Sequence, residues 1–405
     1  MVALRKYILY SVLGLYSLTL LVPAFKSLPK IPSYSIYIYA FILLLIFLRP
    51  LTLLTKEFRI SLIFLIIHLL YLILDNYRYL NERTTETQAE FFLYALFALG
   101  SWSFIKNNLD SKLSKKLTFG IISFSVLTSI TTLFALYFFP DLAREAIGND
   151  NPEEVQEILQ FNVGSYPIQF FNSLLVSVTF YIYMHKKKII WLMITILLAG
   201  VVIYAQIVSI VILMFLNFGL TFILINFKVN NNKKYLITLI TLIFSFYILK
   251  NLIAEFLLFV SKSLKAFEFI SPKLKEIALY LGSGEITESQ NFNMYQYNIR
   301  KEKSINSFVE SPLIGGKSSG GHHFWIDNLA EHGVLGTLPW LLIFLVFSKS
   351  LKRYFDDTEQ IIILNSILIF IIMGLSKNIL MSSMPVMLFL FIPLILYNYG
   401  KNSIR

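Results

Sequence analysis

The sequence predicts an all-α, polytopic membrane protein with about twelve transmembrane helices and a large extracytoplasmic loop before the last three helices. Two observations predict this class. The 405 residues are 56% hydrophobic and their mean hydropathy is +0.68, whereas soluble globular domains are normally about half apolar or less. The apolar residues also form repeated blocks, most of them close to the roughly 20 residues that cross a bilayer. We therefore expect residues 1–405 to form a single integral membrane domain.

The apolar blocks predict helices at residues 7–25, 34–54, 60–74, 89–105, 117–139, 166–184, 189–205, 207–227, 235–259, 334–348, 361–380 and 384–399. The first block is too long for the apolar core of a signal peptide and has no small-residue cleavage site, so we expect it to be retained. The block at 334–348 is short, and we expect its helix to begin earlier, inside the polar run that precedes it.

The distribution of basic residues predicts the orientation. Alternate segments between the blocks hold most of them, namely Arg5, Lys6, Arg49, Lys56, Arg59, Lys106, Lys112, Lys115, Lys116, Lys186, Lys187, Lys188, Lys228, Lys233, Lys234, Lys349, Lys352, Arg353, Lys401 and Arg405. The short segments on the other side hold only Lys26, Lys30, Arg78, Arg83 and Arg144. Because cytoplasmic loops are enriched in Lys and Arg, both termini are predicted to be cytoplasmic. The net charge of +11 is explained by this topology and does not indicate nucleic-acid binding.

Two outer segments are long. Residues 140–165 are acidic, and residues 261–333 form the largest segment outside the predicted spans. The charges of the second segment nearly balance, so it is not a general surface for anionic lipid. The chain has no cysteine, which excludes disulfides, thiolate metal sites and a cysteine nucleophile.

The end of the larger outer segment concentrates polar residues, in the run "GGHHFWIDNLAEHGVLG" at 320–336. A short helix over 304–311 is expected to end at Pro312, because proline cannot continue a helix. A glycine-rich turn at 315–321 then leads to a helix that begins near His322. A helix start attracts anions through its unpaired N–H groups, and Lys317 lies beside it. The alternative for the glycines is an ordinary linker.

The polar run has three interpretations. In the first, the helix start keeps His322 neutral and able to accept a proton in catalysis. In the second, His323, Asp327 and Glu331 share one helix face and bind a metal ion; no HExxH or similar pair supports this, and we expect no metal. In the third, the run is an interfacial polar belt with Trp325 as its anchor.

Arg300 lies ahead of this run in the same outer segment. Its guanidinium group suits a phosphate, which it can grip with two parallel hydrogen bonds. The alternative is a solvated charge on the amphipathic stretch 294–311.

Residues 312–336 resemble the signature of the O-antigen ligase and polysaccharide repeat-unit polymerase family. The matching residues are Pro312, Leu313 and Gly315 in the turn, His322 at the family histidine, Trp325 and Ile326 after it, and Glu331, Gly333 and Gly336 in the tail. His323 departs from the pattern, since the family often has Asn or Ser there, and Gln206 stands where a second family arginine is expected. The resemblance implies an all-helical lipid-linked glycosyltransferase that needs no metal or other cofactor.

The function predicted on these grounds is a polymerase for a capsule, exopolysaccharide or O-antigen. It would join polyprenyl-pyrophosphate-linked oligosaccharides on the outer face of the cytoplasmic membrane, with His322 acting on the attacking hydroxyl and Arg300 and Lys317 on the pyrophosphate. His323, Trp325, Asp327 and Glu331 would support the site. Membrane lipid, a chain-length regulator and a flippase are the expected partners.

Two other functions remain open. One is a ligase of the same family, which transfers the finished chain to a different acceptor. The other is a flippase or transporter for the same lipid-linked sugars, whose charged residues would lie within the membrane. Its candidate residues are His68, Lys250 with Glu255, and Lys377.

Overall fold

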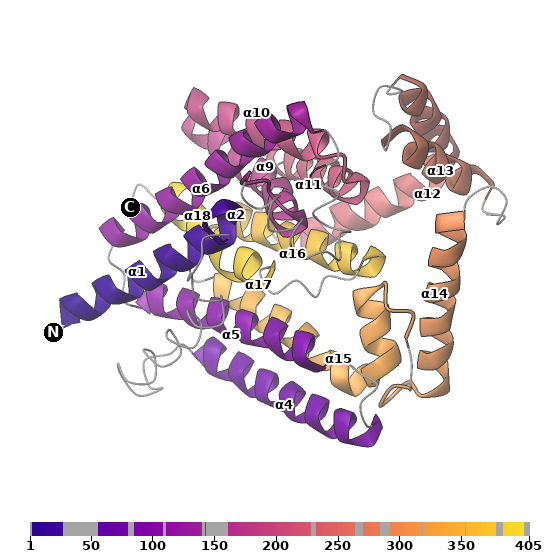
Figure 1. Cartoon of the computed structure of the whole chain (residues 1–405), viewed down its shortest axis with the longest axis horizontal. Coiled ribbons are helices and arrows are strands. Elements are labelled where there is room, and N and C mark those ends of the chain that lie inside the picture. The colour runs from indigo at the N-terminus through magenta and orange to yellow at the C-terminus, as the bar shows by residue number, and fades with distance from the viewer. Residues whose placement is uncertain are drawn as a thin grey trace.

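The computed structural model of the chain describes residues 2–26, 56–79, 85–107, 111–139, 142, 161–227, 232–263, 270–283, 292–316, 319–352, 354–377 and 384–400. Every regular element in these ranges is a helix, so the all-α prediction is confirmed (Figure 1). The helices are α1 (Val2–Leu21), α2 (Pro23–Lys26), α4 (Lys56–Tyr79), α5 (Thr85–Asn107), α6 (Ser111–Phe138), α9 (Tyr166–Lys186), α10 (Ile189–Tyr204), α11 (Val208–Asn226), α12 (Asn232–Ser263), α13 (Ile270–Ser283), α14 (Phe292–Glu310), α15 (Phe324–Leu351), α16 (Asp357–Ser376), α17 (Met384–Val386), the π-turn η2 (Met387–Phe391) and α18 (Ile392–Tyr399).

Several of these helices are long and apolar enough to cross a membrane. Within the described residues, five meet both conditions: Lys112–Phe138, Tyr166–Lys186, Val208–Asn226, Phe324–Leu351 and Asp357–Ser376. Shorter apolar helices cover Tyr10–Leu21, Phe58–Tyr71, Leu93–Ile105, Ile189–Tyr204 and Met384–Tyr399. A multi-pass membrane protein is therefore indicated. The predicted span at 34–54 and most of the outer segment 140–165 lie outside the described residues, and the count of twelve spans stays a prediction.

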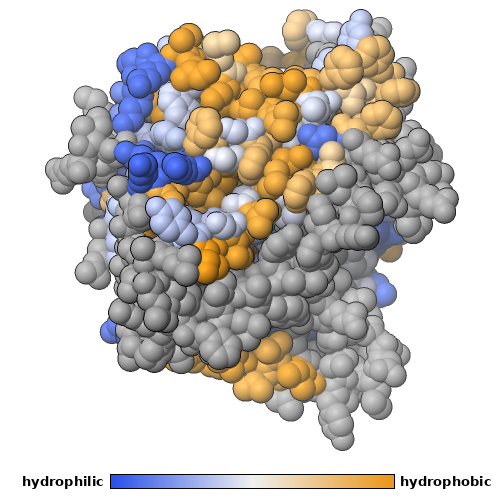
Figure 2. All heavy atoms as spheres, turned by 60° about the vertical axis from the view of Figure 1, so that its left-hand side comes forward, coloured by the Kyte–Doolittle hydropathy of each residue, from blue (hydrophilic) through white to orange (hydrophobic). Residues whose placement is uncertain are grey.

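Apolar side chains cover much of the described surface. Figure 2 shows orange, apolar residues spread over one face, with blue, hydrophilic residues mainly toward its left edge. On α12 alone, Phe244, Tyr247, Phe256 and Phe259 are each more than 60% exposed. A soluble protein rarely exposes such large apolar area, whereas helices that face lipid do so along their length.

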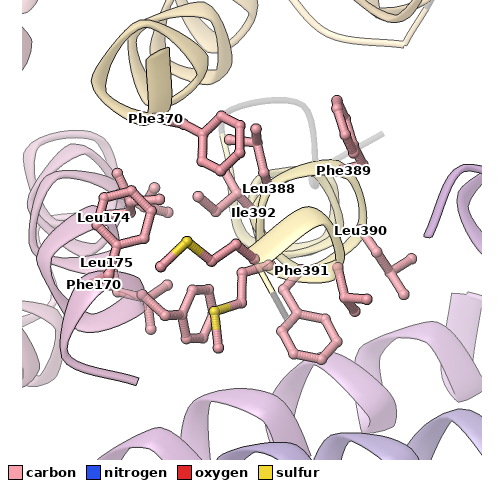
Figure 3. Packing of buried hydrophobic residues seen from close by; sticks show 14 of the residues in the cluster. Phe170, Leu174, Leu175, Phe370, Leu388, Phe389, Leu390, Phe391 and Ile392 are labelled. Carbon is pink, nitrogen blue, oxygen red and sulfur yellow. The ribbon is translucent and has the colours of Figure 1, made fainter. Parts of the chain in front are cut away.

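The C-terminal segment forms the centre of the bundle. Leu388 to Ile392 are each at most 1% exposed. Leu388 and Ile392 lie toward Phe370 of α16 and the α9 side, whereas Phe389 lies on the opposite side (Figure 3) and packs on Phe344 and Phe347 of α15. A helix that is apolar on every side is buried on every side. Polar side chains join neighbouring helices in the same bundle: Asn365 Nδ2 donates to Asn217 Oδ1 at 2.7 Å, as interhelical hydrogen bonds do within membranes.

The two ends of the bundle differ. At the end where α16 begins, the Trp102 ring stacks on Phe355 with centroids 5.7 Å apart, and Asp356 caps α16 in a capping box with Glu359. Lys186 lies within electrostatic range of Glu359, so the basic residue clusters at 112–116 and 186–188 meet at this end. The opposite end holds the start of α15 and the end of α16, roughly 30 Å away along the 20 residues of α16.

The larger outer segment is more helical than the sequence predicts. It contains α13 and α14, and α14 begins at Phe292, well before the predicted start at 304. Figure 1 shows α14 standing across the right-hand edge of the bundle, at the end opposite the start of α1. The helix stops at Glu310, directly before the Ser311–Pro312 turn, as the proline predicts.

Candidate functional site

The turn at residues 311–316, after α14, packs on a break in α15. Gly333 has φ 62° and ψ −168°, which interrupts the helix and frees the next backbone N–H groups. Val334 N–H donates to Pro312 O at 2.9 Å and Leu335 N–H donates to Leu313 O at 3.1 Å. In return, Gly316 N–H donates to Ala330 O at 2.7 Å. The turn therefore supplies the acceptors that the broken helix lacks.

Gly315 and Gly333 allow the backbone of the turn to contact the backbone of α15. A Cβ atom on Gly315 would lie 2.1 Å from Glu331 O, and one on Gly333 would lie 2.4 Å from Leu313 O. Both residues have positive φ, which favours glycine. Gly336 is close-packed in the same way, against the ring of Tyr71 on α4, and Tyr71 Oη lies 2.7 Å from Ile314 O. These contacts hold the turn against α15 and α4.

Asp327 ties α14 to the start of α15. Its Oδ1 accepts a hydrogen bond from Ser304 Oγ at 2.6 Å, and its Oδ2 accepts from the backbone N–H of His323 at 2.6 Å. Ser304 Oγ accepts in turn from Gly320 N–H at 2.8 Å. Carboxylates are favoured at a helix start, so Asp327 stabilises this junction.

The predicted common face of His323, Asp327 and Glu331 is wrong. The helix begins at Phe324, and His323 is its N-cap with an extended backbone, so its ring does not follow the helical spacing. Glu331 instead accepts a hydrogen bond from Ser319 and lies near His332. No group of three metal-ligating side chains occurs among the described residues.

His323 caps the end of α16. Its side chain is fully buried and its Nδ1 lies 3.0 Å from Leu375 O. Because a carbonyl only accepts, Nδ1 carries a proton and donates it to Leu375 O. Tyr297 Oη donates to Ser376 O at 3.0 Å, and Phe324 N–H donates to Lys377 O at 3.2 Å. Three consecutive carbonyls at the end of α16 are thus satisfied by α14 and the start of α15.

Tyr297 also lines the histidine pair. Its ring centroid lies 4.2 Å from that of His323 and 5.6 Å from that of His322, in edge-on contacts. Burial raises the pKa of Tyr297 to about 12, so its hydroxyl stays protonated and serves as a donor. Nothing in the local sequence linked Tyr297 to the histidines, because the contact joins different helices.

His322 is half-buried and surrounded by positive charge. Burial lowers the pKa of its imidazole below the usual 6.5, and the nearby Lys377, Arg300 and His323 lower that pKa further, while Asp327 opposes them. The sequence predicted a neutral His322 from the helix start. In the structure the helix begins at Phe324, and burial and neighbouring cations are what lower the pKa of His322.

Arg300 lies on the exposed side of α14. Its backbone carbonyl faces Gly320, where a Cβ atom would approach to 2.1 Å, so the glycine turn passes directly over it. The charge of Arg300 lies within electrostatic range of His322, and the assignment of the two residues to one site stays a prediction. Lys317 lies outside the described residues.

Trp325 lies inside the bundle, 6% exposed, with its ring centroid 6.0 Å from Phe344 and 6.2 Å from Phe370. Of the residues considered for a transporter, Lys250 and Glu255 are exposed on α12, and His68 Nδ1 lies 2.6 Å from Gly336 O. Lys377, considered with them, instead lies beside His322.

The protonation of His322 gives a testable expectation. A lowered pKa means that the neutral form persists below pH 6.5, and that the charged form appears only at lower pH. In an NMR titration of protein labelled at its five histidines, the signal that His322→Gln removes should titrate below 6.5. Arg300→Gln should move that midpoint upward, because it removes one of the cations. A midpoint above 6.5, or one unchanged by Arg300→Gln, would contradict this electrostatic account.

Comparison with known proteins gave no match: no family model, no curated protein and no solved structure is similar to this chain.

Proposed function

We propose that the protein is a polymerase that joins polyprenyl-pyrophosphate-linked oligosaccharide repeat units into a surface polysaccharide. The observation that carries the proposal is the half-buried imidazole of His322, whose pKa is lowered by burial and by the charges of Lys377 and Arg300, at one end of an apolar helical bundle. A neutral imidazole can accept a proton from a hydroxyl, and a cation can stabilise a leaving phosphate.

The reaction follows from these groups. A hydroxyl oxygen of the acceptor sugar attacks the anomeric carbon of the growing chain, which is linked to the lipid pyrophosphate. The new carbon–oxygen bond forms as the bond to pyrophosphate breaks, and the bonding electrons leave on the pyrophosphate. The hydroxyl proton passes to Nε2 or Nδ1 of His322, and later to water. Arg300 balances the charge on the departing lipid pyrophosphate.

The orientation of the bundle supports a site on the outer face. The basic residues at 112–116 and 186–188 gather at the end of the bundle where α16 begins, whereas His322 lies at the end where α16 stops. Basic residues favour the cytoplasmic side. We therefore place both termini in the cytoplasm, the site outside, and the protein in the cytoplasmic membrane with twelve spans.

Loss of the gene in cells that make the polysaccharide tests the proposal. We expect single lipid-linked repeat units to accumulate on the outer leaflet and polymer to disappear. A ligase would instead leave finished polymer on its lipid pyrophosphate, and a flippase would leave single units on the inner leaflet. Either of these two patterns would overturn the polymerase proposal.

A further inference from the structure

Lys377 is built into the same site as His322. It follows the last residue of α16, where its N–H still donates to Met373 O at 2.8 Å and its carbonyl accepts from Phe324 N–H at 3.2 Å. Its backbone is thereby fixed against the first residue of α15, and its half-buried side chain lies within electrostatic range of His322. These main-chain hydrogen bonds hold the backbone of Lys377 in place and do not depend on its side chain.

The charges around Lys377 are mainly positive. Its neighbours include Lys273 of α13, and His322 is flanked by both Lys377 and Arg300. Among the described residues, no carboxylate forms an ion pair with Lys377 or Arg300. Lys273 has Glu276 at 3.8 Å on its own helix, and Asp327 already accepts from Ser304 and from the His323 backbone. Asp327 is the carboxylate that acts on His322, so the cationic side chains of the cluster outnumber it.

A structural role for the Lys377 ammonium group does not account for this arrangement. A lysine at a helix C-terminus commonly serves to satisfy the last carbonyls. Here the carbonyls of Leu375, Ser376 and Lys377 are already satisfied by His323, Tyr297 and Phe324. Burial and Lys273 also lower the pKa of Lys377, which is the sign of a cation that its protein surroundings do not stabilise. An anionic ligand would supply the missing charge.

We propose that Lys377 and Arg300 together bind the pyrophosphate group of the lipid-linked substrate next to His322, an inference that rests on the proposed function. Arg300 comes from α14 and Lys377 from the end of α16, so the two cations belong to segments far apart in the sequence. A pyrophosphate group carries negative charge on the oxygens of both of its phosphate groups, which suits two cations from separate helices. Tyr297 and His323 cap the helix that carries Lys377.

Direct binding of inorganic pyrophosphate to the full-length protein in detergent tests this site. Calorimetric titration of the wild-type protein should detect pyrophosphate binding, and Lys377→Gln and Arg300→Gln should each weaken it by about tenfold or more, since hydrogen bonds to charged groups carry that free energy. Lys377→Arg should retain most of the affinity. Lys301→Gln is the matched control, because Lys301 points about 100° around α14 from Arg300 and should change affinity less than about twofold.

The results of these titrations decide whether Lys377 and Arg300 bind pyrophosphate. Wild-type affinity in Lys377→Gln, an equal loss in Lys301→Gln, or no pyrophosphate binding by the wild-type protein would overturn it. Size-exclusion profiles of the variants should match the wild type, because the backbone bonds of Lys377 do not need its side chain. If pyrophosphate binding depends on Lys377 but the protein makes no polymer, the proposed function fails and the anion site stands. If polymer forms and Lys377→Gln binds pyrophosphate normally, the function stands and this inference fails.

Discussion

His322→Ala is expected to lower polymer synthesis by about 10²- to 10⁴-fold, the range that general acid–base groups contribute, while the protein still inserts and stays folded. The imidazole is half-buried, and among the described residues the side-chain hydrogen bonds that join α14, α15 and α16 come from Tyr297, Ser304 and His323. Its removal should therefore affect chemistry more than stability. The measurement is polymer formed per unit of membrane-inserted protein, with single lipid-linked units counted alongside.

The neighbouring histidine supplies the matched control. His323 Nδ1 donates to Leu375 O, and the side-chain nitrogen of Asn lies at nearly the same distance from its Cα atom. His323→Asn should therefore keep the cap on α16 and substantial activity, whereas His323→Leu loses the donor and should reduce both stability and activity. If His323→Asn abolishes polymer and His322→Ala does not, the chemistry has been assigned to the wrong histidine.

Gly333→Ala is expected to destabilise the protein by several kcal/mol. The backbone of Gly333 lies at φ 62° and ψ −168°, a region used almost only by glycine, and other residues there cost about 1–3 kcal/mol. Its new Cβ would also lie 2.4 Å from Leu313 O, and the shift would break the bonds from Val334 and Leu335, each worth about 1 kcal/mol. The measurement is the midpoint of thermal aggregation in detergent, read by size exclusion.

Gly219→Ala serves as the control for that experiment. Gly219 lies within α11, and apart from its chain neighbours and the backbone of its own helix no described atom lies within 4 Å of the position that its Cβ would take. Alanine is favoured over glycine in a helix by about 1 kcal/mol, so this variant should keep or raise the midpoint. Equal midpoints for Gly333→Ala and Gly219→Ala would show that the break in α15 is not held by glycine.

The helices that the sequence predicted well are those with one continuous apolar block. Such a block satisfies its backbone hydrogen bonds within its own helix. It can therefore be recognised in the sequence without knowledge of the neighbouring helices. The break at Gly333 could not be predicted in this way, since a single glycine in an apolar run also fits an unbroken helix. It depends on acceptors from Pro312 and Leu313, which reach α15 only through the folded turn.

The residues of the candidate site also differ in whether the sequence alone could indicate them. His322 and Arg300 could be selected from the sequence because they lie in one outer segment and their chemistry suits a phosphate substrate, and their roles stay predictions. The shared face of His323, Asp327 and Glu331 was wrong because the helix begins two residues later than expected. Lys377 and Tyr297 could not be assigned, since their contacts with the histidines connect separate helices. The sequence of an apolar block followed by a lysine does not indicate which other helices the end of that block will contact.

Reconstitution of the purified protein with a single polyprenyl-pyrophosphate-linked repeat unit tests the central claim most directly. The protein alone, without added metal, should convert this substrate into a ladder of products that differ by one repeat unit, and should release one lipid pyrophosphate for each linkage formed. His322→Ala should give neither product. Release of lipid pyrophosphate without a ladder, a ladder that needs a divalent ion, or movement of the unchanged substrate across the membrane would contradict the account.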